Sequence, residues 1–70
     1  MNQGIPEDTI LKIAGSSGFA VDRYSDKSRM ARKKCRRLAK AGRLVLLLKA
    51  TRTLYYMTPE RLAVDREANP

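Results

Sequence analysis

The clearest pattern of hydrophobic and polar positions along the chain lies in residues 26–41. At about 100° per residue, Ala31, Cys35 and Leu38 fall within about 60° of one another and form an apolar stripe. Gly42 follows, and glycine often ends a helix because it adopts a left-handed conformation without strain. The pattern therefore predicts a helix over residues 26–41 that directs one face to a hydrophobic core.

A shorter helix is predicted near the beginning of the chain, from about Pro6 to Gly15. Proline is favoured in the first helical turn, and the acids Glu7 and Asp8 would lie near the positive end of the helix dipole. Residues 15–18 consist of glycine and serine, which favour turns and end the helix. The apolar face of this helix is formed by Ile10, Leu11, Ile13 and Ala14.

The segment between these two helices is too short for its period to identify the structure. A short second helix is predicted over residues 19–24, where the residues able to form one apolar patch are Phe19, Ala20, Val21 and Tyr24. A turn is expected next, because the following residues include the favoured N-caps Ser25, Asp26 and Ser28. The alternative is one continuous helix over residues 20–41, and the sequence leaves both arrangements open.

Two short β-strands are predicted after Gly42. Residues 44–48 are consecutive apolar residues, a run whose length favours a buried strand, and residues 53–58 are rich in β-forming types. A hairpin with a turn near residues 50–52 would connect them. If the first strand alternates regularly, one face carries Leu44, Leu46 and Leu48, and the other carries Val45 and Leu47.

A short final helix is predicted over residues 61–67. Thr58 is a suitable cap, Pro59 suits the first helical position, and Glu60 lies in the first turn. Residues 1–4 and 68–70 are expected to be tails. The chain has 70 residues, which favours one small domain over residues 1–70 without an enclosed catalytic pocket.

The charge of the chain is concentrated in its middle. Eleven lysines and arginines lie between Asp26 and Glu60 without a single acid, and the net charge is +8. An ordinary exposed helix mixes positive and negative side chains, so a merely solvated basic face is the less favoured interpretation. The opposite side of the predicted helix from its apolar stripe carries Arg29, Lys33, Arg36 and Lys40. This arrangement predicts a polyanionic partner, and nucleic acid above all.

The missing residue types exclude several classes of function. There is no histidine and a single cysteine, Cys35, so neither an intrachain disulfide nor a His/Cys metal site can form. Asp22 and Asp26 are the one pair of acids that could share a helix face, and capping or pairing with neighbouring cations explains them more simply. We expect no catalytic residues, no cofactor and no enzymatic activity.

Membrane association is not expected either. No stretch has the length of a transmembrane span, and the N-terminus lacks the apolar region of a signal peptide. The apolar stripe of the basic helix is too thin for insertion into a lipid surface. A cytoplasmic protein, nucleoid-associated if it is bacterial, is the expectation.

The order of helix, helix, basic helix and hairpin resembles the winged helix-turn-helix family of DNA-binding domains. The resemblance rests on SRMARKKCRRLAKAGRLVLLL, with Leu38, Gly42 and Leu44 at the end of the helix and the beginning of the wing, and on the ending from Tyr56 to Thr58. It implies an α+β, mostly helical fold with three helices, a two-stranded wing and a short C-terminal helix. It also implies sequence-specific binding to double-stranded DNA by a small transcriptional regulator or a plasmid or phage DNA-maintenance protein.

A recognition helix fits the major groove, where arginine contacts guanine, while a wing reaches the adjacent backbone or minor groove. The N-terminal part of the basic helix is expected to contact bases, and the later cations and the wing are expected to contact phosphate. The expected DNA-binding residues are Lys27, Ser28, Arg29, Arg32, Lys33, Arg36, Arg37, Lys40, Lys49 and Arg52.

Two further partners remain open. A ribosomal protein with the same fold is similar in the segment from helix to wing, so an RNA-binding or ribosome-associated role is the alternative function. The apolar residues 44–48 exceed what one buried wing face needs, and the surplus leucines would allow a homodimer or packing under the final helix.

Overall fold

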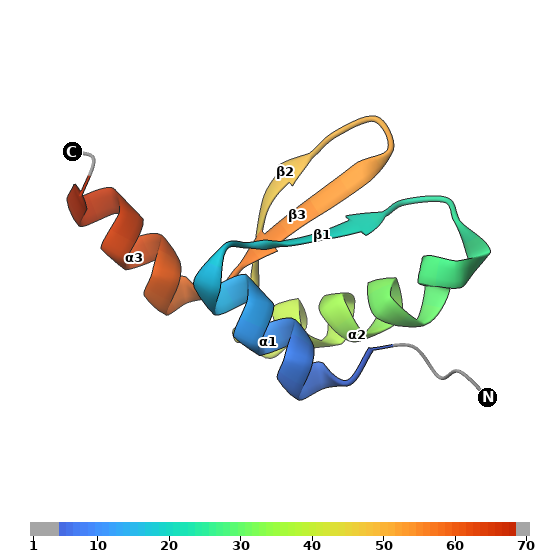
Figure 1. The fold of residues 1–70 in the computed structure, drawn as a ribbon, viewed down its shortest axis with the longest axis horizontal. Helices are drawn as coiled ribbons and strands as arrows, with labels where there is room; N and C mark the ends of the chain where they lie inside the picture. The colour runs from blue at the N-terminus through green and yellow to red at the C-terminus, as the bar shows by residue number, and fades with distance from the viewer. Residues whose placement is uncertain (1–4, 69–70) are drawn as a thin grey trace.

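The computed structural model describes residues 5–68, which form an α+β domain built on a three-stranded antiparallel sheet (Figure 1). In chain order the elements are α1 (Glu7–Ser16), β1 (Phe19–Asp22), the 3₁₀ turn η1 (Asp26–Ser28), α2 (Arg29–Lys40), β2 (Val45–Lys49), β3 (Thr53–Met57) and α3 (Pro59–Ala68). The predicted α+β class, the first helix, the basic helix, the hairpin and the final helix are confirmed. Of the tails predicted at residues 1–4 and 68–70, Ala68 is instead the last residue of α3, and the other residues lie outside the described part of the chain.

Helix α1 begins directly after Pro6, with Glu7 and Asp8 in its first turn. Gly18 ends it: with φ of 91°, this glycine turns the chain so that its N–H donates to the carbonyl of Ile13 at 3.1 Å. The helix therefore runs one residue beyond the predicted Gly15.

The predicted second helix over residues 19–24 is wrong, and so is the alternative of one helix over residues 20–41. Residues 19–22 form strand β1, in which Phe19 and Val21 are buried. The period of two in Phe-Ala-Val-Asp suits a strand, and antiparallel pairing with β3 stabilises it, with Phe19 opposite Tyr56. Helix α2 is thus preceded by strand β1, a turn and the short η1, and not by a second α-helix.

The turn before α2 is built by two short polar side chains. The Asp22 carboxylate accepts the backbone N–H groups of Tyr24 at 2.7 Å and Ser25 at 2.9 Å. The Ser25 hydroxyl accepts the N–H of Lys27 at 3.1 Å and begins η1. The α-helical part therefore begins at Arg29, three residues later than predicted.

The sheet has the strand order β1-β3-β2, which leaves β2 at an edge. Strand β2 pairs with β3 through Leu46 opposite Tyr56 and Leu48 opposite Tyr55, and the register shifts between these two pairs. Leu47 is the extra residue of this bulge. Because a bulge interrupts the alternation of faces, Leu46 and Leu48 lie on opposite faces, which contradicts the predicted shared face.

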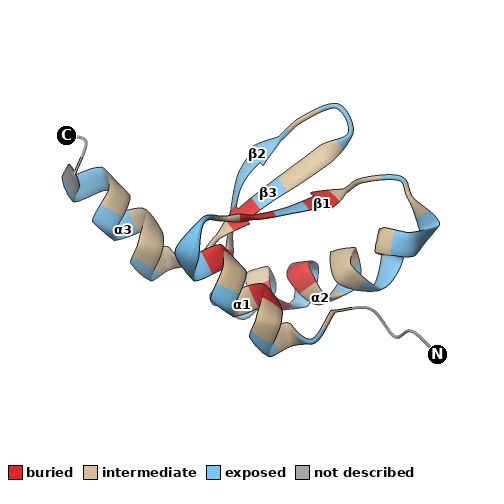
Figure 2. Cartoon of the chain, in the orientation of Figure 1, coloured by how far each residue is buried: buried red, intermediate tan, exposed pale blue. Residues whose placement is uncertain are grey.

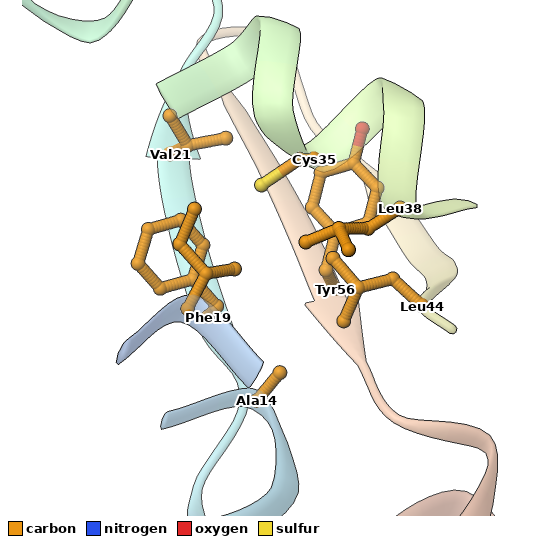
Figure 3. Close-up of a cluster of buried hydrophobic side chains, with 8 residues drawn as sticks. Ala14, Phe19, Val21, Cys35, Leu38, Leu44 and Tyr56 are labelled. Atoms are coloured by element: carbon orange, nitrogen blue, oxygen red, sulfur yellow. The ribbon is translucent and has the colours of Figure 1, made fainter. Parts of the chain in front are cut away.

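The core lies between the sheet and helices α1 and α2 (Figure 2). Figure 3 shows Cys35 and Leu38 of α2 directed toward Phe19, Val21 and Tyr56 of the sheet. The buried hydrophobic residues are Ile10, Ala14, Phe19, Val21, Cys35, Leu38, Leu44 and Tyr56. Burial of the thiol raises the pKa of Cys35 to about 11, so Cys35 is a neutral core residue at neutral pH.

Helix α3 extends away from this core (Figure 1). It begins at Pro59, where the Thr58 hydroxyl accepts the N–H of Arg61 at 3.2 Å, so the predicted threonine cap is confirmed. Leu47 and Leu48 of the hairpin are 43% and 56% exposed. The surplus leucines are therefore not covered by α3.

Candidate nucleic-acid interface

The side of α2 that faces away from the core carries a continuous row of cations. Arg29, Lys33, Arg36 and Lys40, which we call the basic ridge, are all exposed. Their spacing of four, three and four residues stacks them along one face of the helix. None of them forms an ion pair with a described residue. The ridge is therefore a line of positive charge that no described acid neutralises.

The turn before α2 extends this ridge. Lys27 is exposed in η1, and Ser28 is half-buried as the residue before the helix. The Ser28 side chain makes no capping hydrogen bond. Both predicted residues therefore lie at the N-terminal end of the basic ridge.

Arg32 has a different role from its neighbours. Its Nη1 donates to the backbone carbonyls of Asp22 at 2.9 Å and Ser25 at 2.7 Å. These bonds tie the end of β1 and the following turn to α2. Nη1 of the guanidinium is thus occupied by hydrogen bonds within the domain, although Arg32 was predicted to contact DNA.

The flank of α2 that faces α1 is also held by the fold. Arg37 forms an ion pair with Glu7, with 2.6 Å between Nη2 and Oε2, and its side chain is 71% exposed. Lys34 donates from Nζ to the carbonyl of Ile5 at 2.9 Å. An exposed ion pair contributes little to stability, so Arg37 can exchange Glu7 for a phosphate at low cost.

The other predicted cations lie on the hairpin. Lys49 is exposed at the end of β2, and Arg52 is exposed in the turn. The turn is held by Arg23, whose Nη1 donates to the carbonyls of Ala50 at 2.8 Å and Thr51 at 3.3 Å. The backbone N–H of Arg23 also donates to the carbonyl of Arg52 at 2.8 Å. The hairpin tip is therefore fixed relative to the end of β1.

An open pocket of about 440 Å³ separates the hairpin from α2. Three of its lining residues are predicted DNA-binding cations, and the others were not predicted to bind. The lining consists of Arg23, Tyr24, Arg32, Arg36, Ala39, Leu46, Lys49, Leu54 and Tyr56. Arg23 and Tyr24 were missed because residues 19–24 were interpreted as a helix. The alternation of Phe19 and Val21 with Ala20 and Asp22 was the signal that could have placed them at the end of a strand.

Asp22 lies beside this surface, directly before the pocket residues Arg23 and Tyr24. Its hydrogen bonds from the backbone N–H groups of Tyr24 and Ser25 hold the pKa of its carboxyl below the ordinary value, and the charges of Arg52 and Arg32 lower it further. The carboxylate therefore stays ionised at neutral pH and keeps the turn in place.

The described residues contain no group of three or more His, Cys, Asp and Glu side chains able to hold a metal ion. Within residues 5–68, no helix combines the length and the apolar character that crossing a membrane requires. The chain matches no protein-family model, no curated protein and no solved structure.

Proposed function

We propose that this protein binds double-stranded DNA as a small winged helix domain, with the basic ridge of α2 in the major groove. The observation that carries the proposal is the ridge itself: four exposed cations on one helix face without a described acid partner. A helix fits the major groove, and neutralised phosphates release counterions, which drives binding. A small transcriptional regulator or a plasmid or phage DNA-maintenance protein is the role that suits such a domain.

The roles of the side chains follow from their places on α2. Arg29 and Lys33 lie in the first turns, nearest to Lys27 and Ser28, and are assigned to base edges. Arg36, Arg37 and Lys40 lie further along and are assigned to phosphates. Arg32 is reassigned to positioning the turn, because its Nη1 already donates to two carbonyls.

The hairpin would act as the wing. Arg52 is exposed in its turn, and the bonds from Arg23 hold that turn at a constant distance from β1. A rigid tip with an exposed arginine suits the minor groove, where guanidinium groups are attracted to the negative potential. Lys49 stands beside it, toward α2.

The test is a fluorescence anisotropy titration of duplex DNA at several salt concentrations. The triple variant Arg29→Ala, Lys33→Ala and Arg36→Ala should weaken binding and relax sequence preference, and it should lower the slope of log K against log salt by about one, because only Arg36 of the three is assigned to a phosphate. The matched control changes three exposed cations away from the ridge, Lys12, Arg43 and Arg66, and removes the same charge. If both variants lost the same DNA affinity, the loss would be caused by net charge alone, and the assigned interface would be refuted.

RNA binding is the second candidate function. The basic ridge contains only lysine and arginine, without the asparagine or glutamine that reads adenine in the major groove. Such a face also suits recognition of shape and backbone in structured RNA. Competition between duplex DNA and hairpin RNA distinguishes the two, and a preference for the RNA would reverse our choice.

Self-association is a separate proposal that leaves the basic ridge free. The outer face of the hairpin, opposite the core, exposes Leu48 at 56% and its cross-strand partner Tyr55 at 41%. Strand β2 is also an edge strand, and its outward backbone groups can pair with a second copy. A symmetric dimer formed there would carry two basic ridges.

A further inference from the structure

The pocket between α2 and the hairpin has a lining that the basic ridge alone does not explain. Helix α2 contributes Arg32, Arg36 and Ala39, which are spaced four and three residues apart and so share the flank that faces the sheet. Ala39 is small, so the space between helix and hairpin stays open. The volume of about 440 Å³ falls within the range of about 300–1,000 Å³ that small-molecule sites occupy.

The bulge at Leu47 determines which hairpin side chains enter this lining. Lys49 pairs with Leu54, and Leu46 pairs with Tyr56, and all four residues line the pocket. In a regular strand, two residues three positions apart would face opposite sides of the sheet. The extra residue restores Lys49 to the same side as Leu46, and bulges are known to redirect side chains in this way.

The positive charges of the pocket have no compensating acid in its lining. Arg23 and Arg32 are each anchored through Nη1 to two backbone carbonyls, so their guanidinium groups are held in place without losing their charge. Their remaining N–H groups make no hydrogen bond to any described residue. The nearby Asp22 carboxylate is occupied by two backbone N–H groups. Fixed guanidinium groups of this kind are suited to bind phosphate.

An aromatic ring completes the pocket. Tyr24 is 62% exposed, and the guanidinium carbon of Arg23 lies 5.3 Å from its ring centroid. Leu46 and Leu54 provide an apolar wall. Tyr56 also lines the pocket and is only 6% exposed. Its hydroxyl makes no hydrogen bond to a described residue. Cations, an exposed ring and an unpaired donor are together the chemistry that recognises a nucleotide.

We propose that this pocket binds one unpaired nucleotide of a nucleic-acid strand. The base stacks on Tyr24 and the Arg23 guanidinium, and the phosphate lies among Arg32, Arg36 and Lys49. A polymer suits the pocket better than a free nucleotide because Arg36 also belongs to the basic ridge, so the pocket opens directly onto it. The proposal rests on the proposed nucleic-acid binding of that ridge and predicts a preference for duplexes with a single-stranded end.

The experiment compares a blunt DNA duplex with the same duplex bearing a short tail of unpaired thymidines, by fluorescence anisotropy. Tyr24→Ala removes the stacking ring from an exposed position. Val64→Ala is the control, because it truncates an exposed apolar side chain on α3, where Val64 is 56% exposed and lies outside the pocket, the basic ridge and the outer face of the hairpin. Thermal unfolding followed by circular dichroism verifies that both variants fold. Tyr24→Phe retains the ring and should behave as the unchanged protein.

The unchanged protein should bind the tailed duplex about tenfold more tightly than the blunt one, the size expected for stacking of a base on an aromatic side chain. Tyr24→Ala should lose this preference and keep its affinity for the blunt duplex, while Val64→Ala retains both. Equal affinity of the unchanged protein for the two duplexes would overturn the pocket assignment, and so would a preference that survives Tyr24→Ala. Failure of the proposed duplex binding would give a different result from failure of the pocket assignment, because the blunt duplex would then not be bound even at low salt.

Discussion

Replacing Arg32 with alanine separates a structural arginine from the basic ridge beside it. Its Nη1 donates two hydrogen bonds, 2.9 and 2.7 Å long, to carbonyls at the end of β1 and in the following turn. A hydrogen bond to a charged group contributes about 1.5–3 kcal/mol. Because Arg32 is only half-buried, water can replace it at both carbonyls, and we expect Arg32→Ala to lower the free energy of unfolding by about 2–3 kcal/mol.

That loss is large for a chain of 70 residues, whose free energy of unfolding should be about 4–10 kcal/mol. Each kcal/mol shifts the melting temperature of such a domain by about 4–8 °C, so Arg32→Ala should melt about 10–20 °C earlier. The control is Lys33→Ala, which removes the same charge from the next residue. Since Lys33 is exposed and forms no ion pair with a described residue, its loss should change the free energy of unfolding by less than about 0.5 kcal/mol.

Thermal and urea unfolding followed by circular dichroism measure both variants. The stability of Arg32→Lys should lie between those of the two alanine variants, because an ammonium group lacks the planar geometry that spans two carbonyls. If Arg32→Ala were as stable as Lys33→Ala, the two hydrogen bonds to the carbonyls would contribute nothing to the free energy of unfolding. Equal melting temperatures would therefore refute the positioning role.

Three other predictions concern the core, the turn and the edge strand. Leu38→Ala should lower the free energy of unfolding, measured by urea denaturation, by about 2–5 kcal/mol, because Leu38 is only 3% exposed. An unchanged free energy of unfolding would mean that α2 packs on the core through another face. Because the pKa of Asp22 is lowered on folding, its carboxylate contributes stability above the unfolded pKa near 3.8, and this stability is lost as the pH falls through the folded pKa. The free energy of unfolding of Asp22→Asn should therefore depend less on pH below about pH 4. An unchanged dependence would mean that other carboxylates cause the acid destabilisation. Leu48→Lys should shift any dimer to monomer in sedimentation equilibrium without altering α2, and a monomeric unchanged protein would remove the self-association proposal.

The sequence alone predicts the parts of this protein whose causes are local. The apolar stripe of α2, its end at Gly42 and the cap at Thr58 depend on residues within one or two helical turns, and all three are present in the structure. The exposure of the basic ridge follows from the same period, because the side opposite a buried stripe must face solvent.

Strand β1 shows where local reasoning ends. Residues 19–22 are too few for their period to decide between helix and strand, and the decision depends on β3, more than thirty residues later. The bulge at Leu47 is decided in the same way, because the register of β2 depends on its pairing with Tyr56 and Tyr55. Without that register, the side of the sheet reached by Lys49 could not be known.

The cations of α2 are indistinguishable by residue type, and only the tertiary structure separates them. Arg32 is turned to the carbonyls at the end of β1 and in the following turn, Arg37 meets Glu7, and Arg36 lines the pocket without an ion pair to any described residue. Each outcome depends on which backbone or acid from a distant segment lies within hydrogen-bond reach. Charge and period are properties of a sequence, but the partner of a long flexible side chain is a property of the fold, because it is set by contacts between segments far apart in the chain.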